Sequence, residues 1–220
     1  MLARELISHA VPPLKTSDSG NKALNWMNDL HVRHLPIVNN EKLLGLITEE
    51  DVLNFDDPDA SLGSHPLSLN RPFVAETEHL YEVVKVAVNL QLTVVPVVDY
   101  EENYLGVVTL QNLLQYFAES GSLTEPGTIL VLEMNKRDYS LAEIARLVES
   151  ENAAILSSYI SSRPESSKLE VTLKLNRREI KHIVATFERF EYVVKASFQE
   201  SDYMDSLKER YDSLMNYLSV

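Results

Sequence analysis

The sequence contains no cysteine and only six glycines among its 220 residues. The absence of cysteine excludes disulfide bonds and metal sites built from thiolates. The small number of glycines argues against a glycine-rich loop that cradles phosphate groups. We also find no Ser-His-Asp set and no paired acid and base at a catalytic spacing. The sequence therefore predicts a protein that is not an enzyme.

Long apolar runs are missing as well. The best of them, 92–98 and 105–110, fall far short of the roughly 20 residues that a helix needs to cross a bilayer. The first residues carry Arg4 and Glu5 beside only a short apolar stretch, which is unlike a secretory signal. We therefore expect a cytoplasmic protein with no membrane partner.

Positive charge is scarce, because 20 Lys and Arg residues stand against 33 Asp and Glu residues, for a formal net charge of −13. Nucleic-acid backbones bind through clustered cations that release counterions. The densest basic cluster comprises Lys174, Arg177, Arg178 and Lys181. We therefore expect no nucleic-acid partner, whereas one small nucleotide would need only a few local donors.

An internal repeat organises the first half of the chain. Leu35-Pro-Ile-Val aligns with Val95-Pro-Val-Val at an offset of 60 residues. After one inserted residue, Leu44-Gly-Leu-Ile-Thr aligns with Leu105-Gly-Val-Val-Thr at an offset of 61. The insertion falls in a polar turn, where extra residues are tolerated best. A repeat of this length indicates two copies of one structural unit, which we place at 1–64 and 65–120.

Each copy is predicted to form a strand, a helix, two strands and a closing helix. Ser17 and Thr77 are candidate caps for the first helices. The two predicted hairpins cover 34–48 and 94–109, and the closing helices cover 49–55 and 110–119. Because one small sheet cannot bury both of its faces, the two copies are expected to pack together.

The repeated unit resembles the CBS domain. The pattern that carries the resemblance is an apolar-Pro-apolar-Val strand, a turn and then Gly-apolar-apolar-Thr-x-x-Asp. Two such copies in tandem resemble the CBS pair, or Bateman module. The resemblance covers about residues 1–118 and implies an α+β fold with two β-α-β-β-α repeats. It also implies a ligand, an adenosine nucleotide (AMP, ADP or ATP) or an S-adenosyl compound, bound between the copies, and no required cofactor.

The first candidate site follows from Gly45-Leu-Ile-Thr-Glu-Glu-Asp51. Thr48 ends a strand and opens a helix, where free N–H groups favour an anion. Thr48 can donate to a phosphate oxygen, and Asp51 can accept from the ribose hydroxyls. The resemblance adds residues that would lie against the base: Thr16, His34, Leu35 and Pro36.

The second candidate site has Asn112 in place of the aspartate, in Gly106-Val-Val-Thr-Leu-Gln-Asn112. An amide can accept a hydrogen bond, but charge-assisted bonds are about twice as strong. We therefore expect this site, formed by Thr109 and Asn112 with Val95 and Pro96, to bind more weakly or to take a different ligand.

A structural interpretation competes with ligand binding at both sites. Thr-x-x-Asp is also close to a helix capping box, in which the two side chains satisfy free N–H groups of their own helix. His31 and His34 form a His-x-x-His pair, but no third ligand is evident nearby. We therefore predict no metal site.

The last third of the chain follows a linker at 121–127. Residues 128–199 are predicted as strand, helix, strand, strand, helix, strand, the split ferredoxin-like plan. This order resembles an ACT-like domain, and a CBS pair followed by such a domain is similar to the accessory proteins of acetoin utilisation. The loop around Asp138 lacks the Gly that is typical of amino-acid binding, so a role in forming a homodimer is favoured.

A C-terminal helix is predicted over 200–220, with Met204, Leu207, Tyr211, Leu214 and Leu218 at helical spacing. This helix could pack on its own domain or on a second subunit. The sequence as a whole predicts a regulatory protein that senses an adenosine nucleotide and relays it through the ACT-like domain or an unknown partner protein. The alternative is an assembly module that binds no small ligand.

Overall fold

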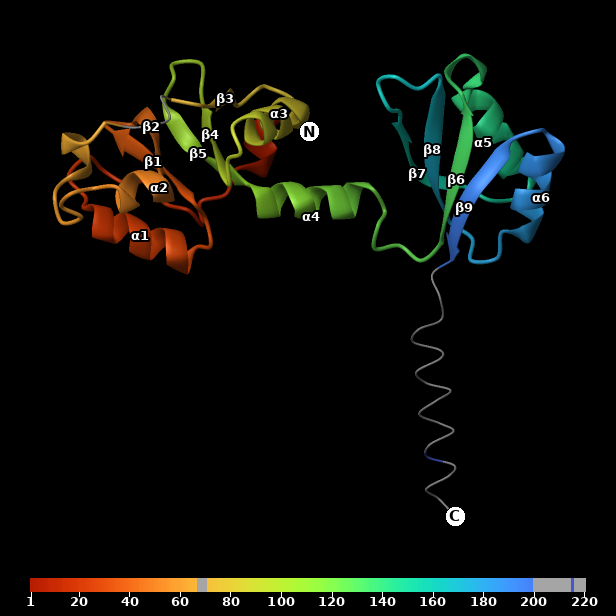
Figure 1. Ribbon diagram of the computed structural model, residues 1–220, viewed down its shortest axis with the longest axis horizontal. Helices are drawn as coiled ribbons and strands as arrows, with labels where there is room; N and C mark the ends of the chain where they lie inside the picture. The colour runs from red at the N-terminus through yellow and green to blue at the C-terminus, as the bar shows by residue number, and fades with distance from the viewer. Residues whose placement is uncertain (67–70, 200–214, 216–220) are drawn as a thin grey trace. The chain divides into compact units, whose positions relative to one another are not determined.

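The computed structural model describes residues 1–66, 71–199 and 215, and the chain divides into two units, Met1–Tyr116 and Phe117–Val220. Figure 1 shows the elements of both units. Both mix helices and strands, so the α+β class is confirmed. Among the described residues no helix is long and apolar enough to span a bilayer. The predicted helix at 200–220 lies outside the described residues except for Met215.

In the first repeat the described elements are α1 (Gly20–Asp29), β1 (His34–Asn39), β2 (Lys42–Thr48) and α2 (Glu49–Leu53). In the second they are β3 (Val74–Ala75), α3 (Leu80–Asn89), β4 (Val94–Val98), β5 (Tyr104–Thr109) and α4 (Leu110–Ser120). Both predicted hairpins are present as antiparallel pairs, β1 with β2 and β4 with β5. The predicted first strand of repeat 1 is only one parallel bridge, from Leu14 to Ile37.

The helices α1 and α3 begin later than predicted. The cap of α1 is Ser19, whose side chain accepts from the Lys22 N–H, and α3 is capped by His79. The prediction that Ser17 and Thr77 cap these helices is therefore wrong by two residues in each copy.

A single hydrophobic core joins the two repeats. Leu35 and Ile37 of β1 are buried in the same cluster as Val95 and Val97 of β4. Complete burial of one such side chain contributes roughly 1.5–3 kcal/mol, so the packing of the two copies against each other stabilises both small sheets. The N-terminal residues also pack on repeat 2, since the Ala3 N–H donates to the Glu78 carbonyl and Ser8 bridges to Val107.

The second unit contains one four-stranded antiparallel sheet in the order β7-β8-β6-β9. Its strands and helices are β6 (Thr128–Asn135), α5 (Leu141–Ser150), β7 (Ile155–Ser161), β8 (Lys168–Leu175), α6 (Lys181–Arg189) and β9 (Val193–Gln199). A short 3-10 helix follows β6 at Lys136–Asp138, and the first unit has two others, at Ala3–Leu6 and Leu62–Ser64. The order strand, helix, strand, strand, helix, strand is the predicted one, while its assignment as ACT-like stays a prediction.

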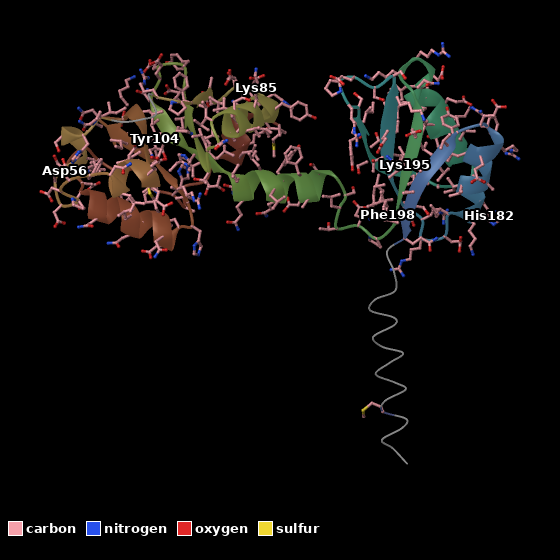
Figure 2. The ribbon with its side chains drawn as sticks, viewed as in Figure 1. Asp56, Lys85, Tyr104, His182, Lys195 and Phe198 are labelled. Atoms are coloured by element: carbon pink, nitrogen blue, oxygen red, sulfur yellow. The ribbon has the colours of Figure 1, made fainter. Side chains whose placement is uncertain are left out.

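The helices α5 and α6 cover the same face of this sheet (Figure 1). Alternate residues of β6 and β8, such as Leu130 and Leu173, pack with Phe187 of α6 in the core. The opposite face carries Tyr159, which is 63% exposed, and Phe198, which is 59% exposed. Figure 2 labels Phe198 and Lys195, both on β9. Lys195 forms an ion pair with Glu170 of β8.

Candidate functional site

Thr48 and Asp51 form a reciprocal capping box at the start of α2. The Asp51 N–H donates to Thr48 Oγ1 at 2.9 Å, and the Thr48 N–H donates to Asp51 Oδ2 at 2.9 Å. Both backbone donors would otherwise lack a helical partner. Thr48 and Asp51 therefore cap their own helix, as the structural interpretation of this motif expects.

The pair also lines a cavity of about 530 Å³, which we call cavity 1. Its walls include Arg33, His34, Thr48 and Asp51 of repeat 1. Repeat 2 closes it with residues 90–91, at the end of α3. The lining thus combines carboxylates, a guanidinium, a hydroxyl and an imidazole. The volume lies within the range of small-molecule sites, roughly 300–1,000 Å³.

His34 is the most buried polar side chain of cavity 1, with 9% of its surface exposed. The Thr93 N–H donates to His34 Nδ1 at 3.2 Å, and Thr93 Oγ1 lies 3.0 Å from the same atom. Because Nδ1 accepts a hydrogen bond, the neutral ring carries its proton on Nε2. Burial lowers the pKa of His34; the nearby Asp51 carboxylate opposes this shift and Arg33 adds to it.

A second cavity of about 380 Å³, cavity 2, occupies the equivalent place in repeat 2. Thr109 and Asn112 line it, as do residues 30–32 from the opposite repeat. Thr109 Oγ1 donates to Asn112 Oδ1 at 2.6 Å, while the Asn112 N–H donates to Thr109 Oγ1 at 3.1 Å. No carboxylate belongs to the described lining of cavity 2, in contrast to cavity 1.

Of the residues predicted to lie against the base in repeat 1, His34 lines cavity 1 and the others do not line it. Leu35 and Pro36 of β1 are buried in the sheet, and the Pro36 carbonyl accepts from the Leu14 N–H. Val95 and Pro96 are buried in β4. The Thr16 carbonyl accepts from the Gly63 N–H. The described linings of cavities 1 and 2 contain Thr48, Asp51, His34, Thr109 and Asn112, but none of these other five residues.

The sequence interpretation missed the walls that each repeat contributes to the other's cavity. Residues 30–31 line cavity 2, and residues 90–91 line cavity 1 at the same offset of 60. His31 and Gln91 even share a left-handed backbone, with φ of 54° and 53°. The repeat itself was the available signal, because equivalent residues of two packed copies occupy equivalent places.

His31 and His34 face different cavities, since His31 lines cavity 2 and His34 lines cavity 1. The described residues contain no group of three or more His, Cys, Asp or Glu side chains that could hold a metal ion. The His-x-x-His spacing therefore does not bring its two rings to one site.

Two segments of the chain, residues 3–57 and 68–119, match the model of the CBS domain family. Inosine-5'-monophosphate dehydrogenase from Methanocaldococcus jannaschii is 27% identical over 116 residues, which are 51% of this chain and 23% of that protein. The chain thus spans about a quarter of the length of this curated relative.

Two solved structures match part of the chain. A CBS domain pair/ACT domain protein from Thermotoga maritima is 23% identical, with 54% of this chain and 98% of that chain covered at a TM-score of 0.49. An acetoin utilization protein from Vibrio cholerae is 22% identical, with 56% and 95% covered at a TM-score of 0.49.

Proposed function

The chain carries a tandem pair of CBS domains, and we propose that it is a regulatory protein that binds an adenosine nucleotide in the cavities of its first unit. The observation that carries this proposal is the repetition of one polar cavity at equivalent places. Each cavity combines the Thr-x-x-Asp or Thr-x-x-Asn motif of one repeat with the end of the first helix of the other.

The chemistry of cavity 1 suits a nucleoside with a phosphate. The Asp51 carboxylate is an acceptor for ribose hydroxyls, and Arg33 and the Thr48 hydroxyl are donors for phosphate oxygens. The capping bond at Thr48 uses the hydroxyl oxygen as an acceptor, so its hydrogen can still be donated. Capping and ligand binding are thus compatible at the same residue.

The regulatory part of the proposal follows from the position of these walls. Each cavity takes residues from both repeats, so an occupied cavity favours one arrangement of the repeats over others. A ligand can shift such an equilibrium only by its difference in affinity for the two arrangements. In this proposal the second unit, as an ACT-like dimerisation domain, or a partner protein receives the change.

Calorimetric titration of the whole chain with AMP, ADP and ATP tests the proposal. We expect at least one of them to bind, and Thr48→Ala and Asp51→Ala to weaken it at least tenfold. Both variants also lose a cap worth about 1 kcal/mol. Ser140→Ala is the matched control, because Ser140 caps α5 by accepting from the Glu143 N–H at 3.3 Å and lies in the other unit.

The control separates the two functions of the motif. Ser140→Ala should lower stability as a lost cap does and leave nucleotide binding unchanged. If none of the three nucleotides binds at millimolar concentration, the proposal is wrong.

The second candidate function is an assembly module without a small ligand. The observation that favours it is the complete capping box, which accounts for Thr48 and Asp51 by itself. This alternative expects Thr48→Ala to change stability alone. It also expects the oligomeric state, measured by sedimentation, to be the same with and without AMP.

A further inference from the structure

Cavities 1 and 2 share the two segments that connect a first helix to the following strand. The segment between α1 and β1 lines cavity 2 with residues 30–32 and cavity 1 with residues 33–34. The segment between α3 and β4 lines cavity 1 with residues 90–91 and cavity 2 with Thr93. A displacement of either segment therefore changes the walls of both cavities.

Hydrogen bonds connect the starts of the helices α2 and α4 through these segments. The Glu49 N–H, at the start of α2, donates to the Arg33 carbonyl at 3.0 Å. The Arg33 N–H donates to Thr93 Oγ1 at 2.9 Å. The Leu110 N–H, at the start of α4, donates to the Thr93 carbonyl at 3.2 Å. Thr93 is thus bonded on one side to repeat 1 and on the other to α4.

His34 adds a second connection to the same residue. Its Nδ1 accepts from the Thr93 N–H, and the Thr93 hydroxyl lies within hydrogen-bond distance of it. Thr93 Oγ1 also accepts from the Arg33 N–H, so this one hydroxyl contacts both Arg33 and His34 of repeat 1. His34 lines cavity 1 and Thr93 lines cavity 2, so this contact joins one cavity wall directly to the other.

We propose that Thr93 couples the two cavities, so that AMP bound in either one raises the affinity of the other. The proposal rests on the proposed nucleotide binding. The coupling is positive because a ligand in one cavity orders the shared segments, and the second ligand then has less ordering to bring about. Couplings between sites are commonly about 5- to 150-fold, and equal in both directions.

The test is calorimetric titration of AMP into the whole chain and into two single-site variants. Leu90→Trp is designed to obstruct cavity 1 and Leu30→Trp to obstruct cavity 2, because these leucines line the cavities at equivalent positions. The product of the two wild-type association constants, divided by the product of the two single-site constants, gives the coupling factor. We expect a factor of about 5 or more.

Thr93→Val, which keeps the shape of the side chain and removes its hydroxyl, is then combined with each tryptophan variant. The coupling factor is then calculated from proteins that all carry Thr93→Val. Any direct effect of Thr93→Val on the affinity of one cavity appears in both products of constants and cancels. We expect the factor to fall to about 1, and Thr93→Ser to restore it, because serine keeps the hydroxyl.

Two AMP molecules bound with a factor of 1 or below would overturn the coupling and leave nucleotide binding intact. A factor that Thr93→Val does not change would overturn the assignment to Thr93. Single-site variants that still bind two AMP molecules would overturn the assignment of the two sites to cavities 1 and 2, and the coupling with it. No AMP binding to any form of the chain would overturn the coupling, and the proposed function fails as well only if ADP and ATP do not bind either.

Discussion

The two CBS repeats have nearly the same hairpin backbone but different side-chain chemistry along it. In repeat 1 His34 pairs with Thr48, and in repeat 2 Val94 pairs with Thr109. The irregularity in each ladder falls at the equivalent place, after Ile37 in one copy and after Val97 in the other. The shared backbone therefore depends on features that both sequences keep, and above all on the buried apolar pattern.

Four pairs of equivalent positions illustrate the contrast between the copies: Gly45 and Gly106, Asp51 and Asn112, His34 and Val94, and Leu43 and Tyr104. Three of these pairs place a different side chain on an equivalent part of the backbone, whereas the two glycines differ in backbone conformation, because only Gly106 of the pair has a positive φ. The difference shows that duplication preserves how a unit folds while its charge, titration and packing change independently. Each pair also offers a substitution that tests the contrast between the copies.

The largest effect is expected at Gly106. Its φ of 153° lies in the region that side chains rarely adopt, and an added Cβ would come 2.5 Å from Ile7 Cγ2. We predict that Gly106→Ala lowers the free energy of unfolding by about 2–3 kcal/mol, from backbone strain and overpacking. Urea unfolding followed by circular dichroism measures this loss.

Gly45→Ala is the comparison for that experiment. Gly106 is the only glycine with a positive φ among the described residues, so Gly45 does not carry the same backbone strain. We expect a clearly smaller loss for Gly45→Ala. Equal losses in the two variants would contradict the assignment of the cost to the special backbone at Gly106.

An exchange of the Asp51 and Asn112 side chains tests the chemical contrast between the cavities. Asp51→Asn should weaken nucleotide binding in cavity 1 about fivefold, because a hydrogen bond to a charged acceptor is stronger by roughly 1 kcal/mol. Asn112→Asp should strengthen binding in cavity 2 by a similar factor. Stability should change little, since Asn112 shows that an amide also closes the cap.

Titration calorimetry of both variants, each combined with the tryptophan designed to obstruct the other cavity, assigns the change to one site. Binding that is the same for Asp and Asn at both positions would show that the charge of this residue does not contribute to the ligand's affinity.

Much of the fold could be predicted from the sequence, because strand and turn patterns are local. Both hairpins, and the starts of the closing helices at 49 and 110, match the prediction. The residue that caps α1 could not be predicted, because Ser17, Asp18 and Ser19 all have side chains that can cap a helix. Only the path of the backbone decides which of them does so. Asp18 instead accepts from the Lys15 N–H.

The candidate site was only partly predictable for a different reason. Thr48, Asp51, Thr109 and Asn112 belong to a local motif, and the structure places all four on cavity walls. Thr93 and residues 90–91 reach those walls only because the copies pack against each other. No pattern within a single copy contains that information, so their part in the site depends on the tertiary structure.

His34, which is Val94 in repeat 2, gives repeat 1 a dependence on pH. Burial lowers its pKa from the ordinary 6.5, so the unfolded chain takes up this proton at a higher pH than the folded one does. Stability from His34 is therefore complete above pH 6.5 and falls as the pH drops below it toward the lowered pKa. The nearby charges are Asp51, which favours protonation, and Arg33, which opposes it.

We predict that the wild-type chain loses more stability between pH 7 and pH 5 than His34→Gln does, because glutamine can accept from Thr93 and does not titrate. Chemical unfolding across this pH range, with both proteins in the same buffers, measures the difference. Parallel pH profiles would show that His34 contributes nothing to it.

The smallest effect is expected at Tyr104, which takes the place of Leu43 and puts a hydroxyl into the packing of repeat 2. Tyr104 packs against the joint core, and its buried hydroxyl has no hydrogen-bond partner among the described residues. The same burial raises the pKa of its phenol. Figure 2 labels this side chain on β5.

Tyr104→Phe should leave the free energy of unfolding unchanged or raise it by up to about 1 kcal/mol, because a buried donor without a partner costs free energy that phenylalanine avoids. Tyr116→Phe is the control, as Tyr116 also packs against this core. Thermal and urea unfolding of both variants measure the effect. A clear loss of stability in Tyr104→Phe alone would mean that its hydroxyl is hydrogen-bonded in solution, and that repeat 2 gained a polar contact where repeat 1 has only packing.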